Sequence, residues 1–176
     1  MATEFDEDSA RRAVKSLKLP IARGATLTFH LDIPSMVIDD PVQELVWRGR
    51  PEAVQFDVEV PADHKLGNAI GTVIASLDSV PVGHLKFKLK VVKNDETVED
   101  TEPVGEKSLR YRKAFISYAS KDRSAVLART QMLKTVGIEF FQDVLDLEPG
   151  TRWEKELYKH IDQCDLFLLF WSTAAK

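Results

Sequence analysis

The residues best placed for chemistry end two apolar segments, "KAFISYAS" (113–120) and "DLFLLFWS" (165–172). Tyr118 and Ser120 end the first segment, and Ser172 ends the second. Small residues after Tyr118 leave the backbone accessible, and a helix that begins there directs its N-terminus to the same place, which favours an anionic group such as a phosphate. Many α/β sheets share this pattern, so it indicates where a ligand would sit and leaves its identity open.

Other catalytic and metal-binding patterns are poorly matched. The four histidines are scattered, and a single cysteine, Cys164, offers neither zinc spacing nor a disulfide within the chain. No GxSxG surrounds Ser117 or Ser120, and no GxxxxGK[ST] phosphate loop occurs. We therefore expect no metal site and no permanently bound cofactor.

The elements that would position these residues alternate between strands and helices over 113–176. A short strand at 113–120 is followed by a helix over 121–136, a strand over 138–141, a second helix and a third strand over 166–171. Ser120 has the position of a cap for the first helix, and Thr151 and Glu154 have capping-box spacing for the second. The apolar sides of the two helices are expected to be Ala125, Ala128, Met132, Leu133 and Val136 in the first, and Trp153, Leu157, Ile161 and Cys164 in the second.

This β-α-β-α-β order predicts a parallel sheet, because its strands are too apolar to face water. Crossovers are right-handed, so helices on opposite faces place the first strand between the second and the third. Ligands bind such sheets beyond the carboxyl ends of the strands where the order reverses. Here that crevice lies between the end of the first strand and the end of the third.

The N-terminal half has a different pattern. Residues 1–20 are expected to be a tail or a short helix, and residues 93–112 an acidic linker, of which 93–108 has no aromatic side chain. Between them, residues 21–92 alternate apolar and polar side chains, as in "TLTFHLDIP", which predicts an antiparallel β-sandwich. Prolines and glycines are expected to break its strands at Pro34, Pro41, Gly49, Pro51, Pro61, Gly67, Pro81 and Gly83.

Composition narrows the classes of partner. The chain is 44% hydrophobic with a net charge of -4, which suits a globular protein and gives no basic field for nucleic acid. The longest apolar run, near six residues, is far shorter than the roughly 20 that span a bilayer. The lysine row Lys86, Lys88 and Lys90 could touch an anionic partner, although a solvated sheet face explains it better. We expect no membrane association and a cytoplasmic location.

Three motifs, in order, resemble the TIR domain, the Toll/interleukin-1 receptor module. They are "KAFISYASKD", "GIEFFQDVLDLEPGTRWEKEL" and "IDQCDLFLLFWS". The resemblance covers residues 113–176 and implies a flavodoxin-like parallel sheet, here its first three strands and two helices, so that the TIR domain is C-terminally incomplete. The preceding sheet is similar to small β domains beside effector modules in bacterial signalling and defence proteins, which suggests a bacterial-type protein of innate immunity.

The resemblance implies two activities. TIR domains assemble with one another, largely through the segment after the second strand, called the BB loop. Many members also cleave NAD+ between nicotinamide and ribose, with a catalytic glutamate in the helix after the third strand, which here lies beyond Lys176. We therefore expect residues 1–176 alone not to hydrolyse NAD+, and residues 113–176 alone to aggregate through an exposed third strand.

The resemblance also assigns residues to the site. Those that would meet NAD+ as a substrate are Tyr118, Ser120, Lys121 and Asp143, and those of the BB loop that would contact other TIR domains are Leu145, Leu147, Glu148, Pro149 and Gly150. Each of the four NAD+ residues has a plainer alternative role. Tyr118 could cover the core and Ser120 could cap the helix, while Lys121 could be a solvated charge. Asp143 could be a turn residue. The function is then one of two. The first is an NAD+-cleaving effector, with the β domain as sensor or scaffold and as the contact for an upstream sensor. The second is a non-enzymatic adaptor that binds other TIR domains.

Overall fold

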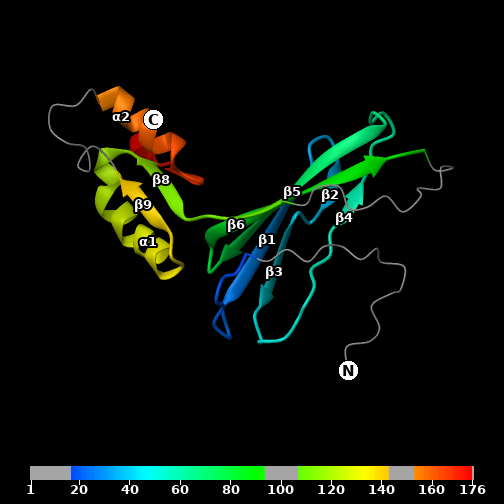
Figure 1. Cartoon of the computed structure of the whole chain (residues 1–176), viewed down its shortest axis with the longest axis horizontal. Helices are drawn as coiled ribbons and strands as arrows, with labels where there is room; N and C mark the ends of the chain where they lie inside the picture. The colour runs from blue at the N-terminus through cyan, green and yellow to red at the C-terminus, as the bar shows by residue number, and fades with distance from the viewer. Residues whose placement is uncertain (1–16, 94–106, 143–152, 176) are drawn as a thin grey trace. The chain divides into compact units, whose positions relative to one another are not determined.

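The computed structural model of the chain describes residues 17–93, 107–142 and 153–175. The chain divides into two compact units, Met1–Arg110 and Tyr111–Lys176, each with its own main sheet (Figure 1). Most of the predicted tail and of the predicted linker lies outside the described residues. The C-terminal end of that linker is ordered as strand β7 (Lys107–Arg110), because its backbone pairs with the long strand β6.

Five antiparallel strands form the main sheet of the first unit, in the order β3-β1-β5-β6-β7. A second sheet consists of two short antiparallel strands, β2 (Val37–Asp39) and β4 (Asp57–Glu59). The antiparallel pairing expected for this half of the chain is therefore confirmed. The remaining strands are β1 (Thr26–Asp32), β3 (Val42–Val46), β5 (Gly67–Leu77) and β6 (Val80–Val91).

The core of the first unit lies on one face of the main sheet. Leu31, Ile33 and Ala69 are buried there, and partly buried apolar side chains pack against them, including Ile38 of β2 and Phe87 of β6. The alternation of side chains along β6 turns its lysines the other way, and these are exposed. The small sheet thus helps to cover the large one, as in a sandwich.

The longest strand pair, β5 with β6, includes a strand that the sequence analysis does not predict. The β5 sequence "GNAIGTVIASL" mixes small residues with apolar ones, so its alternation is weak. The two strands meet at Asp78 and Ser79, whose φ angles of 47° and 68° make a type I′ turn. The Asp78 carboxylate also accepts a hydrogen bond from the backbone N–H of Thr26 at 2.9 Å, which joins this turn to β1.

Two residues expected to break strands, Pro81 and Gly83, lie inside β6, and that expectation is wrong. The register of the β5–β6 ladder shifts between Ala75 and Ser76, opposite these two residues. Such irregularities accommodate a proline within a sheet. Gly83 is required for a different reason: a Cβ there would lie 2.5 Å from the carbonyl oxygen of Leu109 in β7.

Three parallel strands form the sheet of the second unit, in the order β10-β8-β9. They are β8 (Lys113–Tyr118), β9 (Glu139–Gln142) and β10 (Leu166–Phe170). The first of them in sequence, β8, lies in the middle (Figure 1). This confirms the parallel sheet and the strand order that the right-handed crossover rule predicts.

Two helices connect these strands. After a single 3₁₀ turn, η1 (Ser120–Asp122), helix α1 spans Arg123–Thr135, and α2 spans Trp153–Asp162 before β10. The buried side of α1 consists of Val126, Thr130 and Leu133, so the predicted apolar side is wrong except at Leu133. Thr130 is buried without penalty because its hydroxyl donates to the carbonyl oxygen of Leu127 at 3.1 Å within the helix.

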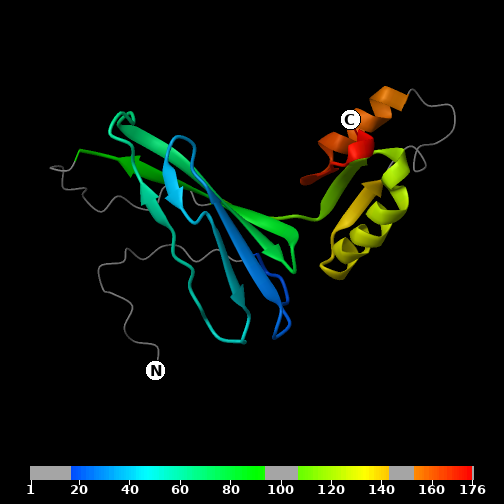
Figure 2. The same ribbon diagram turned by 180° about the vertical axis from the view of Figure 1, so that it is seen from behind.

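The two helices cover opposite faces of this sheet (Figure 2). Lys134 of α1 lies over the ring of Phe140, 5.5 Å from its centroid. His160 of α2 stacks on Phe141, with ring centroids 3.9 Å apart. Because adjacent residues of a strand point to opposite faces, α1 and α2 lie on different sides, as doubly wound sheets require.

Strand β10 exposes apolar side chains. Phe167, Leu169 and Trp171 are 53%, 56% and 68% exposed. The expectation that these strands are too apolar to face water is therefore wrong for one side of β10, which lies at an edge of the described sheet. The expected exposed apolar edge is present. None of the described helices is long and apolar enough to cross a membrane.

Candidate functional site

The carboxyl ends of β8 and β10 lie side by side. The last residues of the two strands, Tyr118 and Phe170, are register partners in the parallel ladder. Strand order reverses here, since β9 lies on one side of β8 and β10 on the other. This is the geometry at which open α/β sheets bind ligands. The ends of the first and third strands, between which the crevice is expected, are therefore adjacent.

A hydrogen bond joins the segments that leave these two strands. The hydroxyl of Ser172, after β10, donates to a carboxylate oxygen of Asp122, at the end of the 3₁₀ turn after β8. The same hydroxyl accepts the backbone N–H of Ala174 at 3.0 Å. Ser172 and Asp122 are half-buried, so this contact is partly shielded from water. It fixes the spacing of the two strand ends.

Asp122 is the site residue that the sequence analysis missed. An acidic residue just before a helix is usually explained by the helix dipole alone, so nothing in the sequence singles out Asp122. Asp122 accepts a hydrogen bond from a serine fifty positions later in the chain, and no local pattern predicts such a contact. The only signal in the sequence was that an acidic residue follows one strand end and a serine follows the other.

The three predicted site residues that the structure describes all lie at this edge. Tyr118 ends β8 and is half-buried, whereas Ser120 and Lys121 are exposed on the 3₁₀ turn that follows. Tyr118, Ser120 and Lys121 lie together because they fall within four consecutive residues, at the end of β8 and in the single 3₁₀ turn that follows it. An exposed lysine beside an exposed hydroxyl can bind an anionic group from solvent.

The expected cap of the first helix is wrong. Helix α1 begins at Arg123, so the N-cap position belongs to Asp122 and not to Ser120. The Asp122 side chain forms no capping hydrogen bond. The 3₁₀ turn moves the helix start past Ser120, and no side chain caps that turn either. The Asp122 carboxylate is oriented toward Ser172 instead. The Ser120 hydroxyl is thus not used by α1.

The remaining predicted residues lie outside the described part of the chain. Strand β9 ends at Gln142 and helix α2 begins at Trp153, on either side of the segment. The expectations that fall in it are Asp143 for NAD+ and Leu145, Leu147, Glu148, Pro149 and Gly150 for TIR contacts. Among the residues that the structure describes, no group of three or more histidine, cysteine or acidic side chains could hold a metal ion.

Comparison with known proteins identifies the second unit. Residues 114–176 match the family model described as TIR domain. No curated protein and no solved structure matches the chain. The match begins at the second residue of β8 and extends past β10, so it includes the two strands whose carboxyl ends lie side by side. TIR domains act in signalling or as effectors, and in general they bind other TIR domains. Residues 114–176 are therefore identified as a TIR domain.

Proposed function

We propose that the chain is part of an effector that binds NAD+ at the carboxyl-edge crevice and cleaves it between nicotinamide and ribose when TIR domains assemble. The observation that supports this most is the adjacency of Tyr118 and Phe170 at the point where strand order reverses. A nucleotide bound there would reach Ser120 and Lys121, which are exposed. Lys121 supplies the positive charge that a diphosphate needs.

The chemistry requires a carboxylate beside the ribose, because the transition state carries oxocarbenium charge. Asp122 is poorly suited to this role, since its carboxylate accepts the Ser172 hydroxyl. We assign Asp122 and Ser172 a positioning role, in which they hold the strand ends at a fixed distance. In this proposal the catalytic glutamate belongs to a helix after the third strand, as the family resemblance implies.

The first unit has the properties of a sensor or scaffold. Its core is independent of the TIR domain, with Leu31, Ile33 and Ala69 buried among its own strands. Its lysine row is exposed and available to an upstream partner. In this proposal the β unit controls when TIR domains meet, in a cytoplasmic bacterial defence response.

The alternative is an adaptor that acts only by binding other TIR domains. The exposed apolar side chains of Phe167 and Leu169 in β10, and of Trp171 directly after it, favour the adaptor. Apolar side chains exposed together are typical of surfaces that associate with a partner. An adaptor needs this surface and no nucleotide site.

A binding experiment separates the two functions. NAD+ is titrated into residues 1–176, with saturation measured by NMR and released nicotinamide measured by chromatography. We expect saturable binding without release, because the glutamate that the resemblance implies is not among these residues. Lys121→Ala should weaken binding about fivefold through loss of an exposed charge contact. Lys155→Ala removes an exposed lysine of α2 and serves as the matched control.

The adaptor predicts a different set of results. NAD+ would show no saturable binding, and sedimentation velocity would show self-association that Trp171→Ala abolishes. Steady release of nicotinamide by residues 1–176 would contradict the assignment of catalysis to a following helix.

A further inference from the structure

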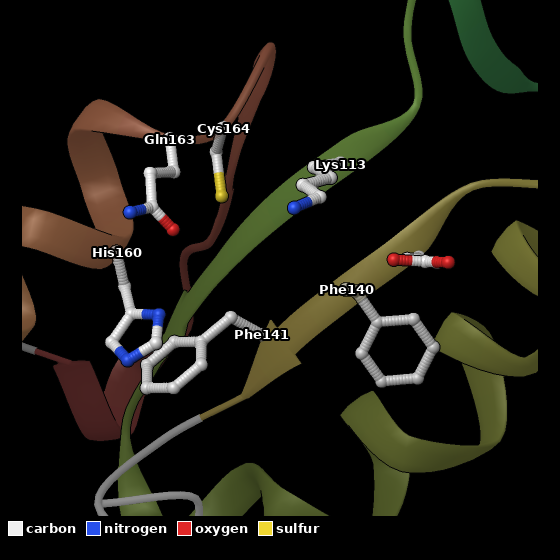
Figure 3. Close-up of a pocket in the computed structure, with 7 residues that line it drawn as sticks. Lys113, Phe140, Phe141, His160, Gln163 and Cys164 are labelled. Carbon is white, nitrogen blue, oxygen red and sulfur yellow. The ribbon is translucent and has the colours of Figure 1, made fainter.

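The amino ends of the same strands surround a pocket of about 480 Å³ (Figure 3). Lys113 is the first residue of β8, and Glu139 is the first residue of β9. Gln163 and Cys164 precede β10 and line the same pocket. Since parallel strands all begin at one edge, this pocket lies at the opposite edge of the sheet from the carboxyl-edge crevice. Its volume is in the range of small-molecule sites.

Aromatic rings form one part of the pocket wall. Phe141 and His160 both line it, and their rings are stacked with an interplanar angle of 11°. Figure 3 shows these two rings on the side of the pocket nearest α2, with the ring of Phe140 farther along β9. Flat, parallel rings favour a flat ligand, because such a ligand gains stacking contact without distortion of the wall.

A positive charge faces these rings. In Figure 3 the ammonium group of Lys113 extends toward Cys164, across the pocket from Phe141. Within the described residues, Lys113 has no carboxylate within 4.0 Å of its ammonium group. Burial, and then Asp165, raise the pKa of the Cys164 thiol. The charge of Lys113 lowers this pKa and so offsets part of the shift.

The backbone around Lys113 is held on both sides. The Asp165 carboxylate accepts the backbone N–H groups of Arg112 and Lys113 at 2.8 and 3.2 Å. The backbone N–H of Asp165 donates to the carbonyl oxygen of Lys113 at 2.9 Å, and that of Glu139 donates to Arg112 at 2.8 Å. The three strand starts are therefore tied together. A pocket with a fixed frame loses little conformational entropy when a ligand binds.

We propose that this pocket binds a small planar aromatic molecule that carries a carboxylate or another anionic group. The ring lies against Phe141 and His160, and the anionic group contacts Lys113. The Gln163 amide, which lies nearer His160 than Lys113 in Figure 3, supplies an N–H donor to the ligand. Glu139 also lines the pocket, as the register partner of Lys113 in the β8–β9 ladder, and it disfavours a second negative charge on the ligand. The site is separate from the proposed NAD+ crevice and does not depend on it.

The single cysteine of the chain gives a direct test. Cys164 lines the pocket, so its alkylation by neutral iodoacetamide at pH 8 reports occupancy. We expect benzoate to slow alkylation saturably, by about tenfold at ten times a dissociation constant of roughly 1 mM. Benzamide, which is neutral and of the same shape, should protect far less, and so should cyclohexanecarboxylate, which is charged and not flat.

Variants assign the protection to the pocket. Lys113→Met should reduce benzoate protection to the level of benzamide, whereas Lys155→Met, at an exposed position of α2, should leave it unchanged. Glu139→Gln should strengthen it, because a repulsive charge is removed. Circular dichroism checks that each variant is folded. Equal protection by all three compounds, no saturation with benzoate, or full protection in Lys113→Met would overturn the proposal.

Discussion

Substitution of Ser172 by alanine tests how the two walls of the crevice are held. The change removes a hydroxyl that donates to the Asp122 carboxylate and accepts the backbone N–H of Ala174. A hydrogen bond to a charged group contributes about 1.5–3 kcal/mol when shielded. Both side chains are half-buried, so the lower part of that range applies. Ala174 is exposed, and water can replace its lost partner. We expect a loss of about 1–2 kcal/mol in the stability of the second unit.

The assay is a double-mutant cycle. Urea unfolding of Ser172→Ala, Asp122→Ala and the double variant is followed by tryptophan fluorescence in a Trp47→Phe background, so that the signal comes from the second unit alone. The coupling energy should be about 1 kcal/mol or more. Thr173→Ala deletes a neighbouring exposed hydroxyl and should change stability by less than about 0.5 kcal/mol. A coupling energy near zero would show that Ser172 and Asp122 contribute independently, and that their hydrogen bond does not stabilise the second unit.

Three further predictions concern stability. Ser79→Gly should stabilise the first unit by about 1 kcal/mol in urea unfolding, because φ of +68° strains every residue except glycine. Phe115→Ala should destabilise the second unit by about 3–5 kcal/mol, since this 7%-exposed ring stacks on a ring of each neighbouring strand, at 5.7 and 5.4 Å; Phe115→Leu should cost less. Burial, and then Asp165, raise the pKa of Tyr111 above its usual 10, so its contribution to stability is full below pH 10 and is lost as the pH rises further. Unfolding of Tyr111→Phe should therefore be less sensitive to pH above 10 than that of the unchanged chain.

The sheet order of the second unit could be predicted because its causes are local or topological. Apolar runs and a glycine after α1 mark the elements, and crossover handedness then places β8 in the middle. The start of α1 could not be placed, because the intervening 3₁₀ turn is distinguished by no residue pattern. Met132 was expected to be buried and is exposed, whereas Thr130 is buried. A threonine can be buried in a helix because its hydroxyl donates to a backbone carbonyl of the same helix.

The first unit was harder to predict for a related reason. Strand β5 contains Gly67 and Gly71, which suggest turns in a sequence, yet Gly71 is buried where a Cβ would lie 2.3 Å from the ring of Phe87. Gly71 therefore leaves the space that the ring of Phe87, on the neighbouring strand, occupies. A hairpin turn made of Asp78 and Ser79 lacks the glycine that usually marks such turns.

The candidate sites depend on contacts between distant segments. Tyr118, Ser120 and Lys121 are consecutive or nearly so, and the sequence could group them. Asp122 and Ser172 meet only after the sheet has formed. The residues that line the amino-edge pocket come from three separate strand starts and one helix. No single sequence motif therefore predicts this pocket.

The central claim is that the carboxyl-edge crevice receives NAD+. The most direct test is a map of backbone amide chemical shifts of ¹⁵N-labelled residues 1–176 during an NAD+ titration. We expect saturable shifts at residues 118–122 and 172–174, with a common dissociation constant. The absence of saturable shifts there, or shifts confined to Lys113 and residues 160–164 at the opposite edge, would contradict it.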